Sequence, residues 1–402
     1  MSDVRMKGFG SRSRVAEGQG LLEARVGCLP PERVPFRRAH LRVLAEDVRS
    51  DRDVPAEAKS SMDGFAVRSS DLPGTLQITA TIMAADRPDI SVGPGHAVRI
   101  MTGARIPEGA DTVVMVELAN VQGDSVLIEK AQAAGTHVLA RGEDFARDQV
   151  VVPKGRRLRP QDVSMLVSAG ALEVAVTRRP RVLIVPTGNE LVLAGEPHAG
   201  KIVESNSYML EGLAIRDGAE VSIHPIVRDR PEQLEEVLLG ADADLVVVTG
   251  GSSVGQEDFG PSVVRKLGEL AIHGIEVRPA SPTGIGFVGS KVVVLAPGFP
   301  VASLVAWDLF ARVAVQRMLG TEVRLPYRKV SAKLGAALKK PERRVELPRV
   351  TLELASELPI AHVMKGGAAL LATSTLGAGF AWLPEGRSEL AAGATVDVHL
   401  YD

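Results

Sequence analysis

The sequence predicts a multidomain protein in which one α/β domain is combined with all-β domains. Between residues 181 and 319, continuous apolar runs alternate with segments of helical spacing, which is typical of parallel strands covered by helices on both faces. Residues 76–130 instead hold short runs of Val, Ile and Thr interrupted by Gly and Pro, as in a small β domain. The same texture returns over 326–402, so a second, C-terminal β domain is expected.

The segments outside these domains give weaker signals. A short helix is expected within Phe9–Arg25, and Arg42–Arg49 is interpreted as a helix end or a short strand. Gly64–Val67 and Val150–Gly155 have the character of strands. Pro160–Ala169 has helical spacing, and Gly170 is expected to end that helix.

The α/β domain is predicted from its apolar pattern. Ser205 or Asn206 can cap the start of one helix and Gly218 its end, while Pro231 suits the first turn of the next. The expected strands are Val182–Val185, Val221–Val227, Leu245–Val248 and Val292–Leu295, and the expected helices are Ser205–Asp217, the segment from Pro231, Pro261–Leu267 and Pro300–Leu319. In the C-terminal domain the expected strands are Val330–Leu334, Arg349–Leu354, Phe380–Leu383 and Thr395–Leu400.

Composition narrows the function classes. A chain of 402 residues has room for two to four domains, and 47 basic against 49 acidic residues give no hint of a nucleic-acid partner. The single cysteine, Cys28, excludes an intrachain disulfide and fits a reducing compartment. The most apolar stretch, Val292–Val315, is broken by prolines and Asp308 and is a poor membrane span. We therefore expect a cytoplasmic protein without a membrane partner.

Three loops follow predicted strands at the edge of the sheet where open α/β folds bind ligands. They are Pro186-Thr-Gly-Asn-Glu190, Arg228-Asp-Arg230 and Thr249-Gly-Gly-Ser-Ser-Val-Gly-Gln-Glu-Asp258. In the third, the glycines allow close backbone approach, and backbone N–H groups and hydroxyls can hold an anion. It is neither a dinucleotide fingerprint nor a Walker A loop, and a plain tight turn is the alternative.

Three acids stand in these loops: Glu190, Asp229 and Asp258. Together they can bind Mg²⁺ beside a phosphate, because Mg²⁺ prefers a few carboxylates plus phosphate oxygens. Singly, each acid is more often a helix cap or a solvated surface group.

The N-terminal half contains three polar motifs: Ser60–Arg68, Met101–Asp111 and Arg141–Asp144. Each also has a purely structural interpretation, respectively a turn entering a strand, a connection between strands, and a local ion pair of little energetic value. The eight histidines form no zinc-binding motif, and no nucleophile elbow supports Ser/His/Asp catalysis.

Taken together and in order, the motifs resemble the MoeA/gephyrin-E family. Ser60–Arg68 matches the family's S-x-M-D-G-[YF]-A, and Arg99–Glu117 matches R-I-M-T-G-A-x-x-P-x-G-A-D-x-V-V. Arg141–Asp144 matches R-G-E-D, and Thr187–Leu191 matches T-G-[DN]-E-L. Thr249–Asp258 resembles the G-G-x-S-x-G-x-x-D loop. The resemblance covers about Phe9 to Leu400, nearly the whole chain.

The resemblance implies four parts and a reaction. The parts are a helical linker over 1–50 and 145–178, an inserted β domain over 51–144, a MogA-like three-layer α/β domain over 179–322, and a C-terminal β-barrel over 326–402. Members of this family form homodimers whose active site joins the α/β domain of one subunit to the β domain of the other. They insert molybdate into adenylylated molybdopterin with Mg²⁺ and release AMP. A MogA-like adenylyltransferase is the expected partner protein.

The resemblance also implies residue roles. Asp63, Glu190, Asp229 and Asp258 would be catalytic, with Asp258 and Glu190 as metal ligands. Seven further residues would bind the substrates, with Arg278 suited to a phosphate or molybdate: Thr102, Asp144, Thr187, Gly250, Gly251, Ser253 and Arg278. Asp63, Thr102 and Asp144 would belong to the partner-subunit side of the site.

Several positions depart from the family pattern. His137 and Leu139 replace an asparagine and an arginine, Ser281 a lysine, Phe299 an asparagine and Ala368 a serine. Losing two charge-assisted hydrogen bonds of about 1.5–3 kcal/mol each would weaken anion binding a hundredfold or more, unless other basic groups such as Arg105, Arg141 or Arg278 compensate.

Three functions therefore stay open. The retained acids and long motifs favour an active insertase. The departures favour a paralogue that binds pterin or nucleotide as a binding or scaffold protein. A different phosphate-ester enzyme, such as a MogA-like adenylyltransferase, is disfavoured by the extra β domains.

Overall fold

The computed structural model describes residues 11–86, 89–197, 199–251, 259–355 and 357–401. The chain forms two compact units, one of Arg33–Val176 and one of Met1–Glu32 together with Thr177–Asp402. None of the helices in the described ranges is long and apolar enough to cross a lipid bilayer.

A small layer of the Arg33–Val176 unit is built around helix α2 (Pro160–Ser168). Its start is fixed by Pro160 in the first turn and by Asp162, whose carboxylate accepts the Arg159 N–H at 2.9 Å. Leu166 faces a core with Leu44, Leu158 and Val176. The predicted helix is confirmed, and the strand interpretation of Arg42–Arg49 is confirmed as β2 (Val48–Arg49), which pairs with β11 (Val150–Val152).

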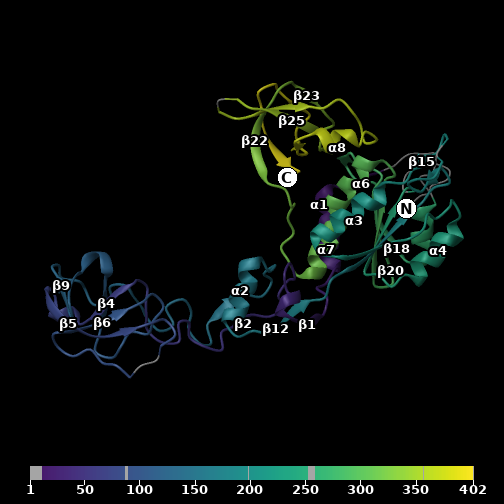
Figure 1. The fold of residues 1–402 in the computed structure, drawn as a ribbon. Helices are drawn as coiled ribbons and strands as arrows, with labels where there is room; N and C mark the ends of the chain where they lie inside the picture. The colour runs from purple at the N-terminus through teal and green to yellow at the C-terminus, as the bar shows by residue number, and fades with distance from the viewer. Residues whose placement is uncertain (1–10, 87–88, 198, 252–258, 356, 402) are drawn as a thin grey trace. The chain divides into compact units, whose positions relative to one another are not determined.

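The same unit contains a six-stranded sheet in the order β7-β4-β6-β5-β9-β8 (Figure 1). Its strands are β4 (Gly64–Val67), β5 (Gly74–Ile82), β6 (His96–Ile100), β7 (Thr112–Met115), β8 (Asn120–Gln122) and β9 (Ser125–Ile128). Strand β4 is buried on both faces, with Phe65 in one core cluster and Ala66 in another. The expected inserted all-β texture is thereby confirmed.

The α/β domain carries a six-stranded sheet in the order β16-β13-β17-β21-β20-β18. The predicted strands are present as β13 (Arg181–Pro186), β16 (Glu220–Ile223), β17 (Leu245–Thr249) and β21 (Lys291–Ala296), all parallel. The expectation of a wholly parallel sheet is wrong, because β20 (Gly284–Val288) and β18 (Glu269–His273) run antiparallel. A two-residue turn at Gly289 and Ser290 joins β20 to β21, and such a short connection reverses the chain.

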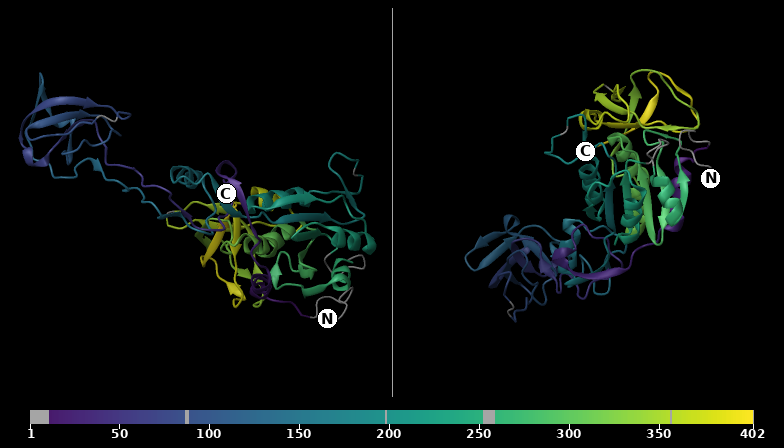
Figure 2. Two further views of the ribbon diagram at one scale, coloured as in Figure 1. Left: turned by 90° about the horizontal axis from the view of Figure 1, so that it is seen from below. Right: turned by 90° about the vertical axis from the view of Figure 1, so that its right-hand side faces the viewer.

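Helices cover both faces of this sheet, so the expected three-layer architecture is confirmed (Figures 1 and 2). One face carries α4 (Pro231–Gly240) and α5 (Gly260–Leu267), which bury Leu234, Leu238, Val263 and Val264. The other carries α1 (Val15–Arg25) and α3 (Asn206–Asp217), packed against a long helical run. That run consists of α6 (Pro300–Ala306), the π-helical turn η4 (Trp307–Ala311) and α7 (Arg312–Leu319).

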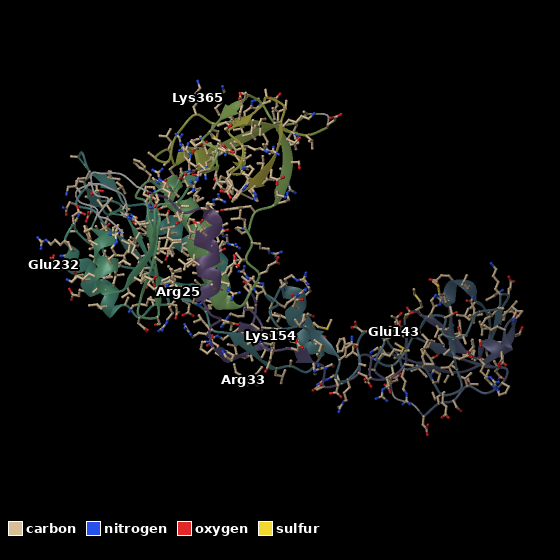
Figure 3. The ribbon with its side chains drawn as sticks, turned by 180° about the vertical axis from the view of Figure 1, so that it is seen from behind. Arg25, Arg33, Glu143, Lys154, Glu232 and Lys365 are labelled. Atoms are coloured by element: carbon tan, nitrogen blue, oxygen red, sulfur yellow. The ribbon has the colours of Figure 1, made fainter. Side chains whose placement is uncertain are left out.

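Helix α1, which the sequence predicts within Phe9–Arg25, is anchored at its end by Arg25 (Figure 3). The Arg25 guanidinium forms an ion pair with Glu269 on β18 at 2.6 Å. It also lies over the ring of Phe287 on β20, 3.7 Å from the ring centroid. An ion pair and a cation–π contact therefore hold the N-terminal helix to the sheet.

The C-terminal domain is a closed barrel in the order β22-β26-β25-β27-β29, as the fold class predicts. Four strands match the predicted ones: β22 (Lys329–Leu334), β25 (Arg349–Glu353), β27 (Gly379–Trp382) and β29 (Thr395–Leu400). The fifth, β26 (Ile360–Val363), is absent from the sequence-based prediction, because four residues with one buried side chain carry little periodicity. Val350, Ala361, Ala381 and Val398 are among the side chains that fill the barrel.

Short elements complete the chain. They are β1 (Pro31–Pro35), η1 (Phe36–Arg38), β3 (Lys59–Ser60), η2 (Ser69–Asp71), η3 (Val116–Leu118), β10 (Val138–Leu139), β12 (Glu173–Thr177), β14 (Leu191–Val192), β15 (Ile202–Val203), β19 (Val277–Arg278), β23 (Leu338–Lys339), β24 (Val345–Glu346), α8 (Ala372–Leu376) and β28 (Glu389–Leu390).

Candidate functional site

A pocket of about 550 Å³, called the large pocket below, lies at the carboxyl ends of β13, β17 and β21. Its walls come from the loops that follow these strands and from β14 and β15. Residues of the predicted site stand in its lining: Thr187, Glu190, Gly250 and Gly251. Ligand pockets of 300–1,000 Å³ at strand ends are typical of open α/β sheets.

The glycine loop after β17 is shaped by close backbone contact. Gly250 has φ +87°, and a Cβ atom there would lie 2.6 Å from the Thr187 carbonyl oxygen. Thr187 is itself buried, and its hydroxyl donates to the Thr249 carbonyl at 3.1 Å. The Thr187 hydroxyl therefore holds two strand ends together, and the loop offers a ligand its backbone.

The two described acids of the strand-end loops, Glu190 and Asp229, differ in their surroundings. Glu190 is exposed in the large-pocket lining. Asp229 is outside that lining and accepts the Asn189 N–H at 3.0 Å, while its own N–H donates to the Asn189 side-chain oxygen at 3.3 Å. This reciprocal pair gives Asp229 a positioning role for the Thr187–Glu190 loop.

Two predicted residues, Ser253 and Asp258, lie outside the described residues. Among the residues that the structure describes, no group of three or more His, Cys, Asp or Glu is arranged to hold a metal ion. Of the two expected metal ligands, Glu190 belongs to the described part.

A second pocket of about 210 Å³, called the small pocket, lies where the α/β domain meets the barrel. It is lined by Arg278, by Arg349 of β25 and by the Gly366–Ala368 loop, among others. Arg349 is only 5% exposed. Its Nε donates to the Tyr401 hydroxyl at 2.8 Å and its Nη1 to the Leu347 carbonyl at 2.7 Å. Its Nη2 is buried without a hydrogen-bond partner in the described part of the chain.

A buried guanidinium N–H without an acceptor is costly, and an anion would satisfy it. The sequence-based reasoning predicts Arg278 and misses Arg349. The feature that could have indicated Arg349 is its place as an arginine at the start of a barrel strand whose first two residues are both buried.

The two pockets share a wall. Pro300 lines the large pocket and Val301 the small one, and the neighbours Ala369 and Ala368 divide in the same way. The Val301 N–H donates to the Ala368 carbonyl at 3.1 Å, so the barrel loop is tied to the start of α6. Ser281 does not restore the lysine it replaces, because its hydroxyl donates to the Ile275 carbonyl at 2.9 Å.

The Arg33–Val176 unit holds the other predicted residues. Asp63 precedes β4, and Thr102 follows β6. The Asp63 carboxylate accepts two hydrogen bonds from Thr102, one from its backbone N–H at 2.6 Å and one from its hydroxyl at 2.8 Å. These bonds from Thr102 lower the pKa of Asp63 and keep it ionised. Asp144 is exposed, and its N–H donates to the Val54 carbonyl at 3.0 Å.

The same unit holds Arg141, which matches the family motif, and His137 and Leu139, which depart from it. Arg141 pairs with Asp53 at 2.6 Å, outside its own motif, so the expected local ion pair is wrong. His137 has φ +55°, with Nδ1 3.0 Å from the Val113 carbonyl. Leu139 is 40% exposed and supplies no charge.

Comparisons with known proteins agree with this layout. Residues 13–170 match the model of the MoeA N-terminal region (domains I and II). Residues 183–317 match a model described as a probable molybdopterin-binding domain, and residues 331–401 match the MoeA C-terminal region (domain IV).

Relatives extend over most of the chain. A protein of Methanocaldococcus jannaschii, whose name assigns it to molybdopterin biosynthesis, is 34% identical over 373 residues, 89% of each chain. A molybdopterin molybdenumtransferase of Nostoc is 34% identical over 303 residues, 72% of this chain and 70% of that one. One of Staphylococcus aureus is 34% identical over 303 residues, 73% and 72% of the two chains.

A solved structure is similar as well. The crystal structure of the molybdopterin biosynthesis MoeA protein from Pyrococcus horikoshii matches with a TM-score of 0.80 and 30% identity, over 97% of this chain and all of that one. The motifs, the order of the matched regions and the relatives that cover most of the chain agree, and we conclude that this chain belongs to the MoeA family.

Proposed function

We propose that the chain is a molybdopterin molybdenumtransferase of molybdenum cofactor biosynthesis. It takes adenylylated molybdopterin and molybdate and releases molybdenum cofactor and AMP. The relatives from Nostoc and S. aureus carry this activity in their names. The single observation that supports it most directly is the pairing of the two pockets across the Val301–Ala368 hydrogen bond.

The two pockets suit the two substrates. The large pocket combines the backbone of the glycine loop with an apolar lining, which suits a phosphate ester that carries a ring. The small pocket carries Arg278 and the uncommitted Nη2 of Arg349, which suit a compact oxyanion such as molybdate. Arg349 would thus compensate for the missing lysine at Ser281, and the departures from the family pattern are compatible with activity.

We extend the proposal to a Mg²⁺ ion held at Glu190 with Asp258. Glu190 is exposed beside the glycine loop, and Mg²⁺ binds through one or two carboxylates plus phosphate oxygens and water. When bound, the ion would neutralise phosphate charge. Asp229 would act by holding the loop that carries Glu190.

The resemblance also supports a homodimer in which Asp63, Thr102 and Asp144 of a second copy complete the site. A MogA-like adenylyltransferase would supply the adenylylated substrate. The reaction would run in the cytoplasm, which fits an exposed thiol on the single cysteine, Cys28.

The deciding experiment measures cofactor formation and AMP release from adenylylated molybdopterin and molybdate. The variant Arg349→Gln removes the charge, and Arg343→Gln removes an exposed arginine of the same domain that lines neither pocket. We expect Arg349→Gln to raise the molybdate concentration needed for half-maximal rate about tenfold or more, since a charge-assisted bond contributes about 1.5–3 kcal/mol. Arg343→Gln should behave as wild type.

Two further results bear on the proposal. Asp258→Ala should abolish turnover if the metal lies where proposed. Tight binding of adenylylated molybdopterin by the wild-type protein with no turnover at any molybdate or Mg²⁺ concentration would overturn the transferase and favour a binding or scaffold protein.

A further inference from the structure

Phe299 is a large apolar side chain in an exposed position. It occupies the N-cap position of α6 and lines the large pocket, and it is 59% exposed. A phenylalanine so exposed adds little to the core of the folded protein. Single exposed apolar side chains are common, so the exposure alone assigns no role.

Three hydrogen bonds fix the backbone on either side of Phe299. The Asn206 side chain of α3 donates to the Gly298 carbonyl at 2.8 Å, and the Ser303 hydroxyl donates to the Pro297 carbonyl at 2.8 Å. On the other side of Phe299, the Val301 N–H is bonded to the Ala368 carbonyl. An exposed ring on a fixed backbone is preorganised, because little loop entropy is lost when a ligand meets it.

The surroundings of this ring define what it can meet. A Cβ atom built on Gly298 would lie 3.6 Å from the Cα of Gly250, so the Phe299 loop adjoins the glycine loop. Leu191, Ile202 and Val203 add apolar surface to the same lining. Glu204, Ser205 and Asn206 add polar atoms that can pair with the edge of a ring. A ligand held there by its phosphate at the glycine loop would have its ring among these groups.

We infer that the ring of Phe299 stacks on a flat nitrogen-rich heterocycle of the substrate and selects for ligands that carry one. This inference rests on the proposed function, because adenylylated molybdopterin offers two such rings, the adenine and the pyrimidine ring of the pterin. Stacking is tolerant of ring identity, since every such heterocycle has a π face. Phe299 would contact substrate without taking part in bond making.

The test compares three variants by calorimetric titration with AMP, with molybdopterin and with molybdate. Phe299→Leu keeps apolar volume and removes the aromatic face, while Phe299→Trp keeps the face. Tyr208→Leu is the matched control, because Tyr208 on α3 is 53% exposed and lies outside the lining of both pockets.

We expect Phe299→Leu to weaken binding of at least one ring-bearing ligand by about five- to hundredfold, the range for loss of one base–aromatic stack. The affected ligand identifies the ring: AMP for adenine, molybdopterin for the pterin. Molybdate has no ring and should bind as in wild type. Phe299→Trp and Tyr208→Leu should retain wild-type affinities.

Three results of the variant titrations would overturn the inference: wild-type affinities for both rings in Phe299→Leu, an equal loss in Tyr208→Leu, or an equal loss for molybdate. Failure of the proposed function looks different. A wild-type protein that binds AMP or molybdopterin through Phe299 but forms no cofactor would retain the inference and lose the transferase. A wild-type protein that forms cofactor while Phe299→Leu binds both rings normally would retain the transferase alone. Binding of neither ring by the wild type would reject the inference as well.

Discussion

The two pockets of the Thr177–Asp402 segment are built in different ways. The large pocket is built mainly from strand-end loops of the α/β domain, with Ala369 of the barrel domain, and its tightest feature is a backbone contact between Gly250 and Thr187. The small pocket is built from segments of two domains, and its main feature is one buried guanidinium, Arg349. The main feature of the large pocket is therefore the shape of its backbone, and that of the small pocket is side-chain charge.

The largest expected effect comes from the structure that both pockets share. Asp217 at the end of α3 is buried, and its carboxylate accepts from Trp307 Nε1 at 2.9 Å and from Arg312 Nε at 3.1 Å. Asp217→Ala would leave the Arg312 charge buried without this partner, and breaking such a pair typically destabilises a protein by about 3–5 kcal/mol.

Chemical denaturation with AMP and molybdate binding measured in parallel checks this. Both affinities should fall together at temperatures where the variant begins to unfold. Arg343→Ala, at an exposed residue that lines neither pocket, serves as control. Loss of one affinity with the other intact would argue that the two pockets do not share this support.

The next effect should separate the pockets. Gly250→Ala places a Cβ atom against the Thr187 carbonyl and requires φ near +87°, while Gly289→Ala requires a similar φ near +59° with open space around the Cβ. The backbone strain of about 1–2 kcal/mol is common to both, and the clash belongs to Gly250→Ala alone.

We expect Gly250→Ala to lower affinity for AMP and adenylylated molybdopterin at least about tenfold more than Gly289→Ala does. Molybdate binding at Arg349 should change little in either variant. Equal effects of the two substitutions on nucleotide affinity would show that the glycine loop does not contact the ligand.

The smallest effect concerns pH and the barrel. His399 of β29 stacks on Phe380 with 5.1 Å between ring centroids, and burial lowers its pKa below the usual 6.5. Between the lowered folded pKa and 6.5, the unfolded chain binds a proton that the folded barrel does not. Stability from this group is therefore full above pH 6.5 and is lost as the pH falls through the folded pKa.

Thermal unfolding between pH 7.5 and 5 should show this loss in the wild type and a smaller one in His399→Phe. Because the barrel supplies Arg349, acid should weaken molybdate binding before AMP binding. An unchanged pH dependence in His399→Phe would assign the acid sensitivity to other groups.

The contrast between the pockets also explains what the sequence could predict. Strands β13, β17 and β21 are continuous apolar runs, so the strand ends and the loops with Thr187, Glu190 and Gly250 could be located from local pattern. A hairpin is harder to predict from the sequence. The antiparallel strands β18 and β20 are absent from the prediction because Gly289-Ser290 gives only a weak turn signal.

Long-range placement could not be predicted from pattern. Arg349 stands about seventy residues beyond Arg278, and the parallel pairing of β19 with β24 brings the two into one lining. The direction of a single hydroxyl is equally invisible: Thr187 and Ser281 both donate to backbone carbonyls, and no spacing rule distinguishes that from a hydroxyl offered to a ligand. The family resemblance supplied the order of the domains, and it did not supply Arg349.

The hydrogen bond from Val301 to Ala368 has a thermodynamic consequence. It ties together two consecutive residue pairs whose members line different pockets, Pro300 with Val301 and Ala369 with Ala368. If an oxyanion at Arg349 shifts the wall that the two pockets share by a fraction of an ångström, the fit of a nucleotide in the large pocket changes. Linkage then requires the nucleotide to change oxyanion affinity by the same factor. Equilibrium titrations of each ligand in the absence and in the presence of the other would measure that factor.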